Sequence, residues 1–206
     1  MATSRTRRTG DAARCGRAAL GVLAPVLLIA LAISGGARAS DSVLGAFHGT
    51  FVGTAATVPA TDSAAKPRLR DIDIVIEPYK TGFRITWITV FRVDGKRVDP
   101  GVRRRTTVQT FLPQDGATGI YRQAAEIDMF RGRRDPDLLA GDTVRWARLD
   151  GRTLSVYSLG LDDRGRYQLQ TYHRRLTSLG LDLEFTRLRD GVVDLRIAGE
   201  AARVRD

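Results

Sequence analysis

The sequence predicts an all-β fold, an antiparallel up-and-down meander that closes into a barrel of about eight to ten strands. Three observations predict it. Apolar and polar residues alternate with a period of two, Asp-Gly pairs separate the alternating stretches, and no long stretch after residue 40 carries an apolar stripe at helical spacing. Period-two alternation is typical of strands with one buried face. Asp-Gly suits hairpin turns, because both residues tolerate positive φ.

Residues 1–39 have the pattern of a cleavable signal peptide. Arginines precede an apolar run from Ala18 to Ile33, and Ala37-Arg38-Ala39 follows it. Signal peptidase needs small side chains at the first and third positions before the cut, so cleavage is expected between Ala39 and Ser40. The run of 16 residues is shorter than the roughly 20 that a spanning helix needs. We therefore expect a periplasmic or secreted protein, without a transmembrane segment after cleavage, whose single domain covers residues 40–206.

The leader carries much of the positive charge. The whole chain has a formal net charge of +10, but residues 1–39 hold six Arg and one Asp. The remainder therefore keeps 27 basic and 22 acidic residues, a net charge of +5, which attracts anionic surfaces only weakly. No recognition helix, zinc finger or aromatic RNA-binding pattern accompanies this charge, so nucleic-acid binding is not expected. Cys15 is the only cysteine, so the domain must rely on its own core without disulfides.

The first half of the domain is expected to begin with a strand over Val43–Val52 and a long exposed loop over residues 54–70, which are rich in Thr, Ala and Pro. Alternation then predicts strands over residues 71–76 and 83–93, and a Thr- and Val-rich stretch predicts one over Arg103–Leu112. Gly119–Phe130 is expected as a further strand, although Ala124-Ala125-Glu126 at its centre would also suit a helix.

The second half reads as a regular meander. Strands are expected over residues 142–149, 152–161, 166–176, 180–188 and 192–204. The turn signals along the chain are Asp94-Gly95, Asp115-Gly116, Asp150-Gly151, Asp190-Gly191 and the variant Asp163-Arg164-Gly165. A short helix is possible over Pro136–Ala140, capped by Asp135. A closed barrel is favoured over a sandwich, because closure removes sheet edges and a sandwich needs longer crossovers.

Leu44-Gly45-Ala46-Phe47 stands on the predicted first strand, ahead of the predicted long loop. In this respect the chain resembles the calycins, which include lipocalins, fatty-acid-binding proteins and avidins. Those families carry Gly-x-Trp at this place, and Phe47 stands here for the tryptophan. In lipocalins an arginine near the last strand packs across that tryptophan, and Arg196 or Arg203 would match it. The resemblance implies a barrel that binds a small molecule. The closing stretch, from Tyr172 to Gly199, is also similar to a bacterial exported family, and this second resemblance does not point to a particular activity.

Four side chains are predicted to contact a ligand. Trp87 and Trp146 lie on apolar faces of separate strands, where they would line a mostly apolar cavity or pack in the core. Arg187 continues the alternation face of Leu183 and Phe185. It would pair with a ligand carboxylate or lie at the barrel rim. With Tyr172 these residues form the predicted site for a small hydrophobic or amphipathic ligand.

Catalysis and metal binding have less support. The chain has two histidines, His48 and His173, and no Gly-x-Ser-x-Gly motif. Its paired carboxylates are Asp71 with Asp73 and Asp162 with Asp163, and the second pair lies in a predicted turn, where acids are common. No catalytic residue, metal site or cofactor is therefore predicted, and an enzyme is less expected than a binding protein.

A second hypothesis is a non-catalytic structural or interaction protein of the cell envelope. It rests on two basic clusters near strand ends, Arg103-Arg104-Arg105 and Arg131-Gly132-Arg133-Arg134. Such clusters would contact an anionic envelope surface, for example lipid headgroups. The alternative interpretation is that they are solvated loop charges.

Overall fold

The structure is a computed structural model. It describes residues 43–58, 67–93, 96–97, 104–125, 127–128, 132–133 and 135–205. The expected cleavage site at Ala39 and Ser40 lies outside these residues, as does the expected turn at Asp94-Gly95. In the described part of the chain, no helix has both the length and the apolar character needed to cross a membrane.

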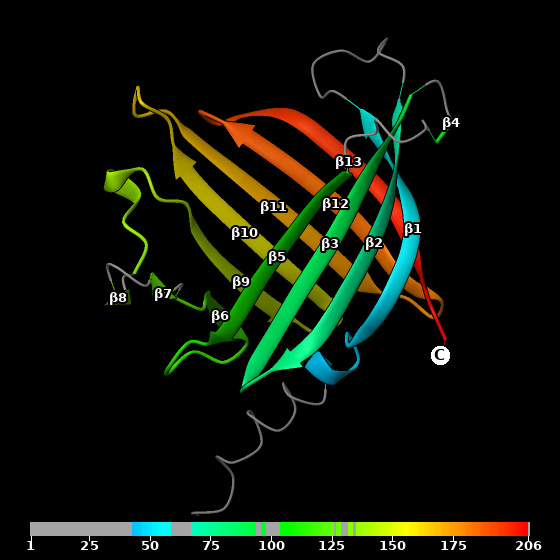
Figure 1. Cartoon of the computed structure of the whole chain (residues 1–206), viewed down its shortest axis with the longest axis horizontal. Coiled ribbons are helices and arrows are strands. Elements are labelled where there is room, and N and C mark those ends of the chain that lie inside the picture. Colours follow the sequence, from blue (N-terminus) through cyan, green and yellow to red (C-terminus); the bar gives the residue numbers. More distant parts are fainter. Residues whose placement is uncertain are drawn as a thin grey trace, which may run out of the picture. The chain divides into compact units, whose positions relative to one another are not determined.

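Ten antiparallel strands close into a ring, which confirms the predicted up-and-down β-barrel (Figure 1). Around the ring they are β1 (Gly49–Val58), β2 (Arg68–Tyr79), β3 (Gly82–Val93), β5 (Arg104–Pro113), β6 (Ile120–Gln123), β9 (Val144–Asp150), β10 (Thr153–Leu161), β11 (Tyr167–Leu176), β12 (Gly180–Arg189) and β13 (Val192–Arg203). β13 pairs with β1 and completes the closure. Outside the ring, β4 (Lys96–Arg97) pairs with β3, and β7 (Ile127–Asp128) pairs with β8 (Gly132–Arg133).

The strands are joined mainly by tight turns of the kind that the Asp-Gly pairs predict. Between β12 and β13, Asp190 and Gly191 both have positive φ, 49° and 82°. This is the backbone that a two-residue hairpin turn with the right twist requires. The turn between β9 and β10 is formed by Gly151 and Arg152, with Gly151 at a φ of 52°, because Asp150 is still paired with Thr153 in the ladder. Sequential neighbours in the sequence are therefore neighbours in the barrel.

The amino-terminal part of the domain differs from the prediction. Residues 43–45 form a helical turn instead of a strand, and the amide of Phe47 donates to the carbonyl of Leu44. Leu44 and Phe47 lie three residues apart, which places both side chains on one side of the turn, and both are buried. They plug one end of the barrel.

The predicted loop over residues 54–70 is also wrong in part. β1 continues through Val58, and β2 begins at Arg68, so residues 54–58 and 68–70 are strand; residues 59–66 lie outside the description. Ala55 and Thr57 are buried. The strand was missed in the sequence because Ala and Thr have small side chains, which produce only a weak period-two pattern of hydrophobicity.

Two shorter segments depart slightly from expectation. A 3-10 helix covers Leu138–Ala140, and its cap is Asp137 rather than Asp135. The Asp137 carboxylate accepts a hydrogen bond from the Leu139 amide at 2.9 Å. Among the described residues of the stretch Gly119–Phe130, the strands are β6 and β7, and Ala124 and Ala125 lie outside both.

The helical turn lies at the lower end of the barrel in Figure 1. Aromatic residues of the buried cluster pack together with Leu44 and Phe47 of this turn. The rings of Phe83 and Phe111 stack with centroids 5.1 Å apart, and Tyr121 meets Phe83 edge-on at 5.3 Å. Phe47 and Phe51 belong to the same buried cluster. Such close-packed apolar contacts supply most of the stability of a domain without disulfides.

Arg203, at the end of β13, fastens the helical turn to this end of the barrel. Its guanidinium lies 4.6 Å from the centre of the Phe51 ring and donates to the backbone carbonyls of Ala46 and His48. Gly49 makes room for this contact, because a Cβ there would lie 2.6 Å from Arg203 Nη1 and its φ is +141°. Of the two arginines that matched the lipocalin pattern, Arg203 lies at the closed end, over Phe51 rather than Phe47.

We predict that Arg203→Ala lowers the free energy of unfolding by about 1–2 kcal/mol, because charge-assisted hydrogen bonds and a cation–π contact are lost. Urea unfolding of the two proteins measures this difference. Arg175→Ala, at an exposed position on β11, serves as the control and should change stability by less than about 0.5 kcal/mol. Equal stability of wild type and Arg203→Ala would contradict the fastening role.

His48 should make the closed end sensitive to acid. Burial, and secondarily the charge of Arg203, lowers the pKa of His48 below its ordinary value of 6.5. The unfolded chain therefore binds a proton more readily, and stability falls as the pH drops from 6.5 through the folded-state pKa. We expect His48→Gln to lose part of the stability difference between pH 7.5 and pH 5, as measured by thermal melts. An unchanged difference would contradict this assignment.

Candidate binding cavity

The other half of the barrel interior is hollow. A cavity of about 550 Å³ begins beside the buried cluster and extends toward the end formed by the β10–β11 and β12–β13 turns. This volume lies within the range of small-molecule sites. Arg105 lines the cavity and is also exposed, so the cavity reaches solvent beside it.

The walls combine apolar and polar side chains. The apolar lining comes from five strands and consists of Ala55, Ile72, Ile74, Trp87, Phe91, Leu183, Phe185, Leu195 and Ile197. Neutral polar groups are supplied by Thr89, Thr107, Gln109, Thr143, Ser158, Gln168, Gln170 and Tyr172. Gln109 is buried, and its Oε1 has no hydrogen-bond partner. Apolar and polar side chains therefore both contribute substantially to the wall, which suits a ligand with an apolar part and a polar part.

An aromatic contact crosses the barrel interior. β3 and β11 are five strands apart in both directions around the ring, so they face each other. Trp87 of β3 meets Tyr172 of β11 with ring centroids 5.4 Å apart, and Phe185 follows at 4.6 Å from Tyr172. These rings give a ligand a flat apolar surface.

Arg174 is the most unusual group of the cavity. Its residue is 3% exposed, and its guanidinium lies 5.3 Å from the Trp87 ring centre and 5.6 Å from that of Tyr172. Two of its nitrogens, Nε and Nη1, are buried without a hydrogen-bond partner. Burial lowers the pKa of Arg174 to about 10, so the group stays charged at neutral pH. A buried cation with unused donors is costly unless something anionic reaches it.

Four further arginines line the same cavity: Arg70, Arg105, Arg145 and Arg187. Arg70 donates to Thr57 Oγ1 and lies 4.9 Å from the Phe91 ring centre, but its buried Nε has no partner. Arg145 Nη1 donates to Gln123 Oε1 at 3.3 Å. Burial raises the pKa of Tyr172, and the charges of Arg174, Arg105, Arg145 and Arg187 oppose this rise. The positive charges are therefore close to one phenol.

Carboxylates balance little of this charge. Arg187 makes a two-point ion pair with Asp194, with nitrogen–oxygen distances of 2.8 and 2.9 Å. Arg70, Arg105, Arg145 and Arg174 have no salt bridge to any carboxylate among the described residues. Glu184 is the one carboxylate in the described lining, and it is exposed, alternating with the inward Leu183 and Phe185. The described interior therefore carries net positive charge.

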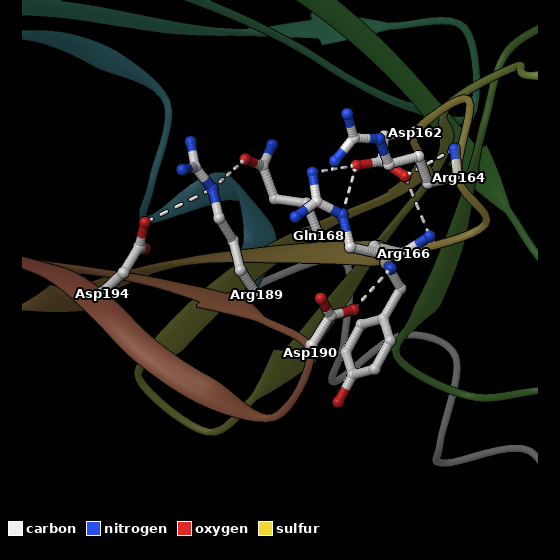
Figure 2. A network of polar contacts seen from close by, with 8 residues as sticks. Asp162, Arg164, Arg166, Gln168, Arg189, Asp190 and Asp194 are labelled. Atoms are coloured by element: carbon white, nitrogen blue, oxygen red, sulfur yellow. Dashed lines mark hydrogen bonds and ion pairs between the residues drawn. The ribbon is translucent and has the colours of Figure 1, made fainter.

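At the cavity end formed by the β10–β11 and β12–β13 turns, aspartates make hydrogen bonds and ion pairs within the protein, as Figure 2 shows. Asp162 accepts from the amides of Arg164 and Arg166 and pairs with the Arg166 guanidinium. These contacts, the largest being the Arg166 side-chain hydrogen bond, lower the pKa of Asp162. Asp194 also reaches Arg189 at 3.3 Å. Asp162 thus stabilises its turn, in line with the turn interpretation of the Asp162–Asp163 pair.

Three of the four predicted ligand contacts, Trp87, Tyr172 and Arg187, line this cavity. Trp146 does not. It stacks on Tyr157 with centroids 5.1 Å apart, and its neighbour Ala147 is the buried one. Since side chains alternate along a strand, Trp146 lies on the outer face of β9, apart from the cavity that the other three residues line. The sequence prediction missed Arg174, although it shares the alternation phase of Tyr172.

His173 borders the cavity, but it alternates with the inward Tyr172 and Arg174, and its ring lies beside Tyr157. Its Nδ1 is hydrogen-bonded to Ser155 Oγ at 2.8 Å, and its ring meets Tyr157 edge-on. Ser155 is buried in β10, which is paired on both sides. The amides near this serine are committed to the sheet, so they offer no oxyanion donors for nucleophilic chemistry.

The basic cluster at Arg103–Arg105 is split. Arg105 lines the cavity, and Arg104 is exposed beside it; Arg103 lies outside the described residues, as do the side chains of the cluster at residues 131–134.

Comparison of the chain with models of known protein families finds no match, and comparison with curated proteins finds none either.

Proposed function

We propose that this barrel binds a small amphipathic anion. The observation that carries the proposal is Arg174, a buried guanidinium with two unpartnered nitrogens that lies against the Trp87 and Tyr172 rings in a cavity of about 550 Å³. An anionic group of a ligand would accept the unused hydrogen bonds and offset the charge. Its apolar body would contact Trp87, Ile74 and Phe185.

The two tryptophans allow a direct test, because the chain has only these two. In Trp146→Phe the remaining Trp87 reports on the cavity, and in Trp87→Phe the remaining Trp146 reports on the outer face. We expect 2-naphthoate to change the fluorescence of Trp146→Phe in a saturable way and to leave that of Trp87→Phe almost unchanged. Isothermal titration calorimetry gives the affinity independently.

The role of charge is tested by removing the positive charge from the protein or the negative charge from the ligand. The Trp146→Phe protein that also carries Arg174→Met should bind 2-naphthoate about tenfold or more weakly, because a charge-assisted hydrogen bond is lost. The neutral analogue 2-naphthalenemethanol should bind weakly to both proteins. The proposal fails if no amphipathic anion perturbs Trp87, or if Arg174→Met leaves the affinity unchanged.

We also propose that the protein acts outside the cytoplasm, as the leader pattern of residues 1–39 predicts. Protein recovered from the periplasm or medium of its expression host should then have Ser40 as its first residue. Amino-terminal sequencing checks this prediction. Full-length protein confined to the cytoplasm would contradict it and would leave the binding proposal standing.

A further inference from the structure

The cavity holds more positive charge than one carboxylate neutralises. Arg187 is already paired with Asp194, but Arg70, Arg105, Arg145 and Arg174 are not paired with any described carboxylate. A monoanion would leave about three of these charges in a partly apolar space, where charge repulsion is stronger than in water. A ligand with two negative charges would balance them better.

The arginines also approach from several directions. Arg70 belongs to β2, Arg105 to β5, Arg145 to β9 and Arg174 to β11, so they are spread around the ring. A planar carboxylate offers two oxygens in one plane. A phosphate monoester offers three strong acceptor oxygens in a tetrahedral arrangement and carries a charge near −2 at neutral pH. Donors spread around a centre suit the second geometry.

Unused donors support this choice. The buried Nε of Arg70 and the buried Nε and Nη1 of Arg174 have no partners, and they come from strands on different sides of the cavity. A tetrahedral group offers three oxygens to donors that come from different sides, while its ester oxygen leads to the apolar body.

We propose that the ligand of this cavity is a phosphate monoester on an apolar or aromatic body, bound as the dianion. This inference rests on the proposed binding function and narrows its ligand class. It predicts discrimination by charge number between anions of the same shape.

The test uses Trp146→Phe protein with 1-naphthyl phosphate and 1-naphthalenesulfonate, which share a ring system and a tetrahedral anionic group. The second pKa of a phosphate monoester is about 6, so its charge rises from −1 to −2 between pH 5 and pH 7.5, whereas the sulfonate stays at −1. We expect the affinity for the phosphate to rise about tenfold or more over this range. Affinity for the sulfonate should change much less, which controls for pH-dependent changes in the protein itself.

A charge variant of the protein provides the second arm. Arg145→Gln should lower the affinity for 1-naphthyl phosphate at pH 7.5 more than that for 1-naphthalenesulfonate. Arg148→Gln, exposed on the same strand and paired with Asp150, should lower neither. Inorganic phosphate distinguishes a free ion from an ester, and it should compete at least tenfold more weakly than the naphthyl ester.

The outcomes separate the two proposals. If the sulfonate or 2-naphthoate binds at pH 7.5 as tightly as the phosphate, the proposed preference for a dianion is wrong and the proposal of anion binding stands. If inorganic phosphate binds as tightly as the ester, the proposal that the ligand has an apolar body is wrong. If none of these anions perturbs Trp87, both proposals fail.

Discussion

Arg174→Met is expected to raise the free energy of unfolding by about 1–4 kcal/mol, because it replaces an unpaired buried cation by an apolar side chain of similar length. Burial lowers the pKa of Arg174 from 12.5 to about 10. A cation whose pKa is lower in the folded state destabilises that state at every pH below the folded-state pKa, including neutral pH. The contacts with Trp87 and Tyr172 offset only part of this cost.

Urea unfolding measures the stability gained by Arg174→Met, and anion titration of the same protein samples measures the binding lost. Arg174→Met should unfold at higher urea and bind 1-naphthyl phosphate more weakly than wild type. Arg148→Met, at an exposed position on β9, should leave both quantities within error. A destabilised Arg174→Met protein would mean that the guanidinium holds the fold together, and that its place in the cavity is structural.

Phe111→Ala is expected to lower the free energy of unfolding by about 3–5 kcal/mol. Phe111 is fully buried, stacks on Phe83 and is paired with Gln123 of β6. β6 is the shortest strand of the ring, with three residue pairs to each neighbour, so side-chain packing must hold it in place. Loss of the ring leaves a cavity and loosens this link at once.

Thermal and urea melts measure this effect, and Phe91→Ala is the matched control. Phe91 has the same side chain in the same barrel, but it is 36% exposed near the cavity. Its removal should cost about 1 kcal/mol or less. If Phe111→Leu, which keeps most of the volume, is as unstable as Phe111→Ala, the loss does not come from the emptied space.

The hairpin order of the barrel was predictable from local signals. Gly151 and the Asp190-Gly191 pair allow tight turns through their positive φ, and period-two alternation gives the strands between the turns. The helical turn at residues 43–45 was not predictable, because apolar side chains at Val43, Leu44 and Phe47 would suit a strand as well as a helical turn. The helical turn becomes favourable only once the ring of strands has formed, because it then covers the apolar side chains at the end of the barrel.

The cavity was predictable in part for a similar reason. Tyr172 and Arg187 follow apolar faces that the alternation marks clearly. The outward position of Trp146 was not predictable, because β9 has large side chains on both faces, and alternation alone does not say which face is inward. Arg70 and Arg145 gave no distinct signal, since an arginine on a strand usually points to solvent. Their approach to Tyr172 depends on ring closure, which brings together strands far apart in the sequence.

The division of the interior has a consequence for motion. Each long strand passes from a packed aromatic half into a hollow half, so the same ladder of hydrogen bonds is supported unevenly along its length. Amides beside Phe83 and Leu154 should exchange with deuterium only on global unfolding, whereas those beside Gln168 and Arg187 should exchange through smaller openings. Local opening at the cavity end would let a ligand enter, while the packed aromatic end keeps the ring of strands closed.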